Sequence, residues 1–480
     1  MNQKKVTYLL LILAVCLIAA LFFVQTGKAP TGRDSALENP EVSKVLPQES
    51  DLVESDQAKP SENADGRKQA AEPNVLLIIL DDIGLDYFPG YLSGQGFEKA
   101  MMPTMTDMMN KGFVFEGLHT YSMCSPTRAS LLTGVHGVDT GVLDAGRTSY
   151  LDPKWQSVQQ EIKSVSDNSI TTAVFGKWHL LGSNRTYYTH PNEFGIDHYE
   201  GIIEGNHESY GNWDKTVNGV QEASGVYSTT AFTDAAIDWI DQQEGQWFTW
   251  LAYTAPHTPF HLPPADLHTI DGLSGDERDL RRNKDKYFMA MLESVDTEIG
   301  RLLQSFDEET RNNTYVIVIG DNGTGGVSQE PFKSVGVKGS LHVGGVNTPM
   351  VVYSPYHNGG GVVYDQLIST IDFYPTILDM LELQQKTERS GKTFYPLVSG
   401  EANLHIKQEH VFVQDTESVA VRSETHKLIR NLQTNEEFLY NITQDFYEQN
   451  NLLNTNLDQK EKVQHDSLSN QLDLFLQSNY

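Results

Sequence analysis

The sequence is poor in cysteine, with only Cys16 and Cys124 among its 480 residues. Cys16 lies inside an apolar run of 19 residues, Val6 to Val24, that contains no charged residue. A thiol in such a segment cannot pair with one in a folded domain, so the stability of the chain must come from packing rather than from disulfides. Cys124 is therefore a lone thiol in a chain whose first segment predicts export, and it calls for an explanation other than pairing.

Positive charge is also scarce. The chain has 35 Lys and Arg against 64 Asp and Glu, which gives a formal net charge of −29. This balance excludes a nucleic-acid partner, which requires a basic face, and it disfavours a broad surface for polyanions. An anionic substrate would need a local positive pocket within a negative surface.

The first 72 residues lack the composition of a folded domain. Residues 1–24 contain Lys4 and Lys5 followed by an apolar run long enough to cross a bilayer as a helix. Residues 25–72 contain no aromatic residue, no Ile and no Met, and such a segment cannot bury enough apolar area to fold. We expect residues 1–24 to be an uncleaved membrane anchor, or alternatively a cleaved signal sequence, and residues 25–72 to be a disordered linker. Either way the body of the protein lies on the periplasmic or extracellular side.

What the sequence does contain is apolar runs that end in polar pairs. Val75–Leu80 is wholly apolar and is followed by Asp81 and Asp82, and the similar run Thr314–Gly320 is followed by Asp321 and Asn322. Such runs predict strands buried on both faces of a parallel sheet. Ligands of open α/β sheets bind at the carboxyl ends of the strands, and four oxygen-bearing side chains gathered there suit a hard cation such as Ca²⁺.

Two more strand-like runs end in histidine-bearing segments. Residues 172–175 precede Lys177 and His179, which are two positions apart and so point to the same side of an extended chain. Residues 247–253 precede His257, which has a proline on each side, and these prolines restrict the backbone around it. Taken alone, each segment would more often be a surface feature, but after a buried strand it points toward the ligand end of the sheet.

The run around Cys124 resembles the signature of the sulfatases, Cys-x-Pro-x-Arg followed by a short helix and Thr-Gly. It matches at all five defining positions, which are Cys124, Pro126, Arg128, Thr133 and Gly134. Pro126 favours a helix start here, which would place Arg128 at the helix entry, where the N-terminus attracts anions.

Other segments resemble sulfatase motifs in the family's order. These are the Asp-Asp and Asp-Asn pairs, Gly176-Lys177-Trp178-His179, Ala255-Pro256-His257-Thr258-Pro259, and the segment from Lys338-Gly339 to Pro349. Two positions depart from the family pattern: Val343 stands where Glu is usual, and Asn347 where Arg is usual. The departures put local geometry and substrate preference in doubt, rather than activity.

The resemblance implies an α/β fold of the alkaline phosphatase superfamily, with a large mixed β-sheet flanked by helices and a smaller C-terminal α+β subdomain. We expect a sulfatase catalytic domain over residues 73–395 and the subdomain over residues 396–480. In the second half of residues 458–476 the apolar spacing is helical, which predicts a helix that packs on the body.

The resemblance also implies that Cys124 is oxidised to formylglycine by a formylglycine-generating or sulfatase-maturing enzyme. The hydrated aldehyde attacks sulfur, and the sulfated hemiacetal then breaks down when its second hydroxyl loses a proton. Asp321 helps to activate the nucleophile beside one Ca²⁺ ion. The metal ligands implied are Asp81, Asp82, Cys124 (as formylglycine), Asp321 and Asn322.

The remaining site residues carry charge or protons in the same scheme. Arg128 and Lys177 hold formylglycine and sulfate, and His179 contacts the diol and assists elimination. His257 and Lys338 bind sulfate and protonate the leaving oxygen. The expected activity is hydrolysis of sulfate monoesters, with a sulfated small molecule or a sulfated glycan as substrate.

Two alternatives stay open at this point. One is a phosphonate monoester or phosphodiester hydrolase of the same superfamily, and the other is an inactive protein that binds sulfated glycans. The residues that choose the substrate are expected in three loops, 205–218, 266–285 and 323–337, where Tyr210 and Trp213 either stack on a ring of the substrate or simply pack.

Overall fold

The computed structural model describes residues 72–184, 186–399, 406 and 408–478. The predicted membrane segment and nearly all of the predicted linker lie outside these residues. Within the described part of the chain, no helix is long and apolar enough to cross a membrane. The described residues form one compact unit.

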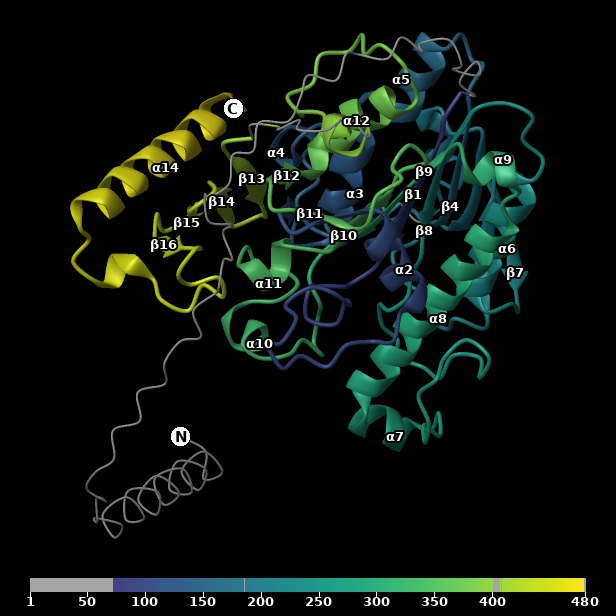
Figure 1. Ribbon diagram of the computed structural model, residues 1–480, viewed down its shortest axis with the longest axis horizontal. Helices are drawn as coiled ribbons and strands as arrows, with labels where there is room; N and C mark the ends of the chain where they lie inside the picture. Colours follow the sequence, from purple (N-terminus) through teal and green to yellow (C-terminus); the bar gives the residue numbers. More distant parts are fainter. Residues whose placement is uncertain (1–71, 185, 400–405, 407, 479–480) are drawn as a thin grey trace, which may run out of the picture. The chain divides into compact units, whose positions relative to one another are not determined.

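A ten-stranded mixed sheet forms the centre of this unit (Figure 1). Its strand order is β11-β2-β10-β9-β1-β8-β4-β5-β6-β7, and the stretch from β9 to β5 is parallel throughout. The strands are β1 Asn74–Leu80, β2 Phe113–Phe115, β4 Thr171–Lys177, β5 His198–Ile202, β6 Trp213–Val217, β7 Val220–Ser224, β8 Trp247–Ala252, β9 Thr314–Gly320, β10 Met350–Tyr353 and β11 Val362–Tyr364. The four strands predicted from apolar runs are therefore confirmed as β1, β4, β8 and β9.

Helices cover both faces of the sheet because each central strand is apolar on both sides. On one face, Val75, Leu77 and Ile79 of β1 share a core with α3, α5 and α12, and on the other face the alternate β1 residues pack with α2, α6 and α8. Figure 1 shows α6 and α8 beside the strands, apart from α3 and α12. The helices are α2 Pro103–Lys111, α3 Cys124–Thr133, α4 Gly137–Thr140, α5 Val158–Val165, α6 Ser228–Ile240, α7 Glu277–Arg282, α8 Lys284–Ser305, α9 Glu308–Arg311, α10 Phe332–Val335, α11 Val343–Val346, α12 Phe373–Met380 and α13 Tyr395–Val398.

A second, antiparallel sheet follows near the C-terminus. Its strands run in sequence order, and the helix α14 Gln459–Ser478 packs Leu468, Leu472 and Phe475 against one face, as the helical spacing predicts. The other face packs on Leu341 and Val346 of the main body. The strands are β13 Val411–Gln414, β14 Ser418–Arg422, β15 His426–Asn431 and β16 Glu437–Asn441. Two short strands pair separately as β3 Leu118–His119 and β12 Ile368–Ser369, and three 3-10 turns occur at His190–Phe194, Thr370–Asp372 and Leu452–Asn454.

The strand register determines which loops meet. Leu80 at the end of β1 pairs with Gly320 at the end of β9, and Ile79 pairs with Ala252 at the end of β8. Ala252 in turn pairs with Gly176 in β4. All four strands are parallel, so the segments that follow them emerge at the same edge of the sheet.

The three expected specificity loops contain more regular structure than predicted. Residues 205–218 include β6 at the edge of the main sheet, residues 266–285 include α7, and residues 323–337 include α10. The side chains of Tyr210 and Trp213 are buried and pack around His207. Packing is thus the role that the structure assigns to these two rings.

Candidate active site

The two polar pairs meet where β1 and β9 end. The backbone N–H of Asp82 donates to Asp321 Oδ1 over 3.1 Å, and Asn322 Nδ2 donates to Asp82 Oδ1 over 2.8 Å. Asp81, Asp82, Asp321 and Asn322 are all buried. Asp82 has a φ of 68°, a left-handed conformation that turns the chain sharply after the strand. The structure thus gathers two pairs of oxygen-bearing side chains, and the pairs lie about 240 positions apart in the sequence.

The helix α3 brings Cys124 and Arg128 to this edge. It begins at Cys124, two residues before Pro126, and ends at Gly134, whose φ of 64° closes the helix in the left-handed region. Arg128 Nη2 donates to Asp321 Oδ2 over 2.8 Å, and Nη1 donates to the Lys177 carbonyl oxygen over 3.0 Å. Arg128 therefore links the ends of β4 and β9 from a fully buried position.

Cys124 lies between a carboxylate and an ammonium group. Its Sγ is 3.4 Å from Asp81 Oδ1 and 3.4 Å from Lys338 Nζ. Burial, followed by the charge of Asp81, raises the pKa of the Cys124 thiol to about 12, although Lys177 and Lys338 oppose this. A thiol with such a pKa carries almost no thiolate at neutral pH and is a poor nucleophile as it stands.

Lys177 and Lys338 neutralise the two adjacent aspartates. Lys177 Nζ pairs with Asp81 Oδ2, and Lys338 Nζ pairs with Asp82 Oδ1. Burial opposes the ionisation of Asp81, but Lys177 and other nearby cations overcome it and hold the pKa of Asp81 well below its ordinary value. Asp81 is therefore a carboxylate at neutral pH.

His179 occupies an unusual backbone position beside α3. Its φ is 61°, and its carbonyl oxygen accepts a 2.7 Å hydrogen bond from Ser125 Oγ. A methyl group on Gly205 would lie 2.2 Å from His179 Nε2, so the bare backbone of Gly205 lies directly against the ring. Burial, with Lys177 next, lowers the pKa of His179 well below its usual value. His179 is therefore neutral at neutral pH.

His257 faces the same cluster from the segment after β8. Its Nδ1 is 2.7 Å from the Thr258 carbonyl oxygen, and since a carbonyl only accepts, Nδ1 carries a proton. Its Nε2 is 3.7 Å from Asp82 Oδ2. The Tyr210 hydroxyl reaches the carbonyl oxygens of His257, at 2.6 Å, and of Thr254, at 2.9 Å. Because Nδ1 donates to Thr258, Nε2 is the atom left to exchange a proton. Burial lowers the pKa of His257, while Asp82 opposes this.

The donor set fits a divalent cation. Ligand atoms of Asp81, Asp82, Cys124 and His257 all lie within 4.8 Å of one another. Asn322 Oδ1 is buried and has no hydrogen-bond partner among the described residues, as a metal-facing amide oxygen would be. Burial and the charge of Asp81 raise the pKa of Asp321 to about 7. A cation among these oxygens would keep Asp321 ionised, and carboxylate and amide oxygens are the ligands of hard cations.

The two positions that depart from the family pattern have other partners. The backbone N–H of Val343 donates to Glu448 Oε2 over 3.0 Å, and Lys427 Nζ holds Glu448 Oε1 at 2.8 Å. Lys427 and Glu448 are both buried. Asn347 Nδ2 donates to the carbonyl oxygens of Glu116 and Leu118. The segment after Lys338 is thus held by the C-terminal sheet on one side and by the β2–β3 segment on the other.

Family comparison agrees with this arrangement. Residues 73–383 match the family model for "Sulfatase", and residues 338–476 match "N-sulphoglucosamine sulphohydrolase, C-terminal". The chain belongs to the sulfatase family. Members of this family are sulfuric ester hydrolases, and the α/β fold with its large mixed sheet agrees with the same assignment.

Curated relatives resemble this sulfatase over most of its length. It is 24% identical to "Uncharacterized sulfatase YdeN" of Escherichia coli (strain K12), over 75% of this chain and 73% of the relative. It is 24% identical to "Arylsulfatase G" of Mus musculus, over 65% and 66% of the two chains. It is 25% identical to "N-acetylgalactosamine-6-sulfatase" of Homo sapiens, over 66% and 64%. The alignments thus leave about 27 to 36% of each relative unmatched.

Solved structures share the fold. The structure described as "Crystal structure of Ps i-CgsB in complex with k-i-k-neocarrahexaose" superposes with a TM-score of 0.69 at 23% identity, and covers 85% of this sulfatase and 94% of that chain. "Structure of BT4656 in complex with its substrate D-Glucosamine-2-N, 6-O-disulfate" gives 0.66 at 19% identity, with 85% and 98% covered. At these identities the likeness establishes the fold alone.

The structure thus brings together every residue that the sequence nominated. Sequence reasoning missed the residues that support them, among them Ser125, Gly205, Lys427 and Glu448, and it missed the hydrogen bond from Tyr210 to the segment of His257. Ser125 and Tyr210 act through single hydroxyl groups on distant carbonyl oxygens, so no local pattern marks them. Asp86 was also missed: it accepts hydrogen bonds from Thr324 and Ser328 and fixes the start of the 323–337 segment.

Proposed function

We propose that this sulfatase hydrolyses sulfate monoesters by means of a formylglycine made from Cys124, with Ca²⁺ held by Asp81, Asp82, Asp321 and Asn322. One observation carries the proposal. Cys124 Sγ lies within reach of a carboxylate, Asp81, and an ammonium group, Lys338, and yet as a thiol it is almost fully protonated. A buried and unreactive thiol at the centre of a charged cluster is best explained as the precursor of a different nucleophile.

The charge of the cluster suits a sulfate ester. Three carboxylates oppose three basic groups, so a divalent cation would leave about +2 in a site within a chain of net charge −29. That local excess supports the capture of an anion and the stabilisation of charge on its sulfuryl oxygens. The groups counted are Asp81, Asp82, Asp321, Arg128, Lys177 and Lys338.

The chain's own residues would divide the remaining work. Converted to formylglycine and hydrated, residue 124 supplies one hydroxyl for attack on sulfur and a second whose deprotonation expels sulfate. Arg128 and Lys177 hold the anion, and Asp321, next to Asp82, accepts a proton from the nucleophile. His179 is neutral and takes up the proton that elimination releases.

Two groups face the leaving oxygen in this scheme. His257 carries a fixed proton on Nδ1 and exchanges a second proton at Nε2, while Lys338 is a half-buried cation. Burial alone would lower the pKa of Lys338, but the charges of Asp82 and Asp81 raise it well above the ordinary value. Lys338 therefore serves as a charge that binds sulfate, and His257 Nε2 is the better source of the proton for the alcohol.

The same proposal includes the maturing enzyme, the class of substrate and the export of the protein. A sulfatase-maturing enzyme would supply the oxidation of Cys124, and a sulfated small molecule or glycan would be the substrate. The apolar run Val6 to Val24 supports export, with membrane attachment through residues 1–24 as one form of it.

Mass spectrometry of the protein purified from its native host tests the nucleophile. The peptide that contains residue 124 should have the mass expected with formylglycine in place of cysteine. The Cys124→Ala variant should release sulfate from 4-nitrophenyl sulfate more slowly by more than about 10³-fold. Cys16→Ala, which removes the other cysteine, is the matched control and should keep full activity. Unmodified Cys124 in an active enzyme, or full turnover by Cys124→Ala, would overturn the proposal.

A further inference from the structure

A large cavity lies beside the candidate active site. Its volume is about 890 Å³, at the upper end of the range for pockets that hold small molecules. It is walled by residues 208–211 and 259–265, together with residues 225, 227, 268 and 270–273, and we call it the His261 cavity. Half of its lining residues come from two of the three segments expected to choose the substrate, 205–218 and 266–285.

The His261 cavity shares its walls with the segment that carries His257. Pro259, two residues after His257, lines the cavity. Tyr210 also lines it, and the Tyr210 hydroxyl is 2.6 Å from the His257 carbonyl oxygen. In the proposed reaction His257 faces the leaving oxygen, so the alcohol part of the substrate extends from the sulfate toward this side.

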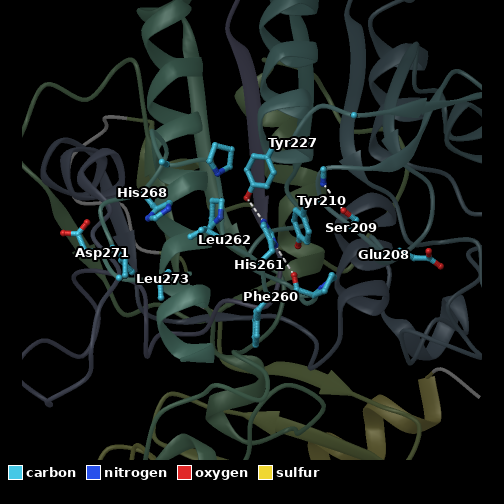
Figure 2. Close-up of a pocket in the computed structure, with 18 residues that line it drawn as sticks. Glu208, Ser209, Tyr210, Tyr227, Phe260, His261, Leu262, His268, Asp271 and Leu273 are labelled. Atoms are coloured by element: carbon cyan, nitrogen blue, oxygen red, sulfur yellow. Dashed lines mark hydrogen bonds between the residues drawn. The ribbon is translucent and has the colours of Figure 1, made fainter. Parts of the chain in front are cut away.

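The lining combines ring faces with hydrogen-bonding groups. The rings of Tyr210 and His261 stack with centroids 4.2 Å apart, and His261 Nε2 is 3.0 Å from the Tyr227 hydroxyl. Figure 2 shows His261 next to Tyr210 and joined to Tyr227 by a hydrogen bond. Both ring nitrogens of His268 lack a hydrogen-bond partner among the described residues. The half-buried rings of Tyr227 and Phe260, beside the unmatched ring nitrogens of His268, suit a sugar ring, which presents apolar C–H faces and hydroxyl groups at its edge.

The charge of the cavity has only one sign. Glu208 and Asp271 line it from opposite sides in Figure 2, and the described residues that line it include no Lys or Arg. A second sulfate on the substrate would therefore meet carboxylates without a compensating cation, whereas hydroxyl groups can donate to them.

We propose that the His261 cavity binds the alcohol part of the substrate and selects a carbohydrate that bears a single sulfate and is otherwise uncharged. This inference rests on the proposed sulfatase activity and adds the substrate class to it. It predicts that this sulfatase removes an isolated sulfate and discriminates against densely sulfated chains.

The test compares sulfate release from monosaccharides that carry one sulfate with release from the same monosaccharides carrying two. The purified full-length protein that contains formylglycine is used with Ca²⁺, and 4-nitrophenyl sulfate reports basal activity. We expect kcat/KM for the singly sulfated sugar to exceed that for its doubly sulfated counterpart by about tenfold or more. Asp271→Arg, which adds a cation to the cavity, should lower this ratio of kcat/KM values by about fivefold.

The matched control is Glu309→Arg, which makes the same change of charge at an exposed carboxylate that does not line the cavity. It should leave the ratio unchanged. Doubly sulfated sugars used as well as singly sulfated ones, or equal effects of the two variants, would overturn the inference while activity on 4-nitrophenyl sulfate persists. Absence of sulfate release from every ester, 4-nitrophenyl sulfate included, would instead contradict the proposed function.

Discussion

Single residues next to the charged cluster determine how its histidines point. His179 is in the left-handed region, where non-glycine residues are uncommon, and three contacts define its place: Ser125 on its carbonyl oxygen, Ile203 on its N–H, and the backbone of Gly205 on its ring. A side chain at position 205 would occupy the space of the imidazole. The position of His179 therefore depends on a residue whose only contribution is its lack of a side chain.

Gly205→Ala tests this dependence. The added methyl group would lie 2.2 Å from His179 Nε2, so the ring must move, and we expect kcat to fall by about 10²-fold while KM changes little. Steady-state kinetics on an aryl sulfate measures the two constants separately. Gly245→Ala is the control, because a methyl group there meets nothing within 4 Å. Equal kinetics for the two variants would show that the ring tolerates the displacement.

At the scale of elements, buried carboxylates connect helices that are distant in sequence. Asp296 of α8 accepts the backbone N–H groups of Thr104 and Met105 at the start of α2, each over 2.9 Å. The pair of hydrogen bonds caps α2, which has no side-chain cap of its own. Burial raises the pKa of Asp296 to about 6 despite these donors. Since this pKa is above that of the unfolded chain, the folded state binds the proton more tightly, and the resulting stability is lost as the pH rises through 6.

The pH dependence of unfolding tests the role of Asp296. Relative to Asp296→Asn, which does not titrate, the free energy of unfolding of the parent protein should fall by about 1.4 kcal/mol between about pH 5 and about pH 7.5. Urea unfolding at several pH values measures the difference. A constant difference over this range would mean that Asp296 stays ionised and that its two N–H donors outweigh its burial.

For the molecule as a whole, the proposed cation connects the strands at the centre of the main sheet. Asp81 and Asp82 follow β1, while Asp321 and Asn322 follow β9, so a bound ion would bridge neighbouring strands of the core. An ion that binds only the folded state raises the stability of the entire compact unit.

Removal of the metal tests this linkage. EDTA should lower the thermal midpoint of unfolding, and Ca²⁺ at about 100 times its Kd should restore about 2.7 kcal/mol of stability. Asn322→Leu, which removes the buried amide oxygen, should need a higher concentration of Ca²⁺ for the same effect. Differential scanning calorimetry provides the measurement, with Mg²⁺ as the comparison ion. Identical midpoints with EDTA and with Ca²⁺ would contradict the site.

The sequence allowed prediction of those features that depend on residues contiguous in the chain. The apolar runs that became β1 and β9, and the polar pairs that follow them, are contiguous in the chain. The supports of the site are not encoded in this way. Gly205 meets His179 only because β5 lies beside β4, and Glu448 reaches Val343 from 105 positions away. A glycine or a glutamate in an ordinary loop has no local signal for such a contact, so the architecture was predictable while the supporting residues were not.

The hydrogen bond from Val343 to Glu448 has a consequence for synthesis. A ribosome releases the segment that holds Lys338 long before it releases Glu448, and during that interval the N–H of Val343 has no carboxylate partner. This support of the site therefore forms only after another 105 residues have followed Val343. A shortened product that ends before residue 448 would contain every residue proposed for chemistry. It would still lack the hydrogen bond from Val343 to Glu448 that holds the Lys338 segment.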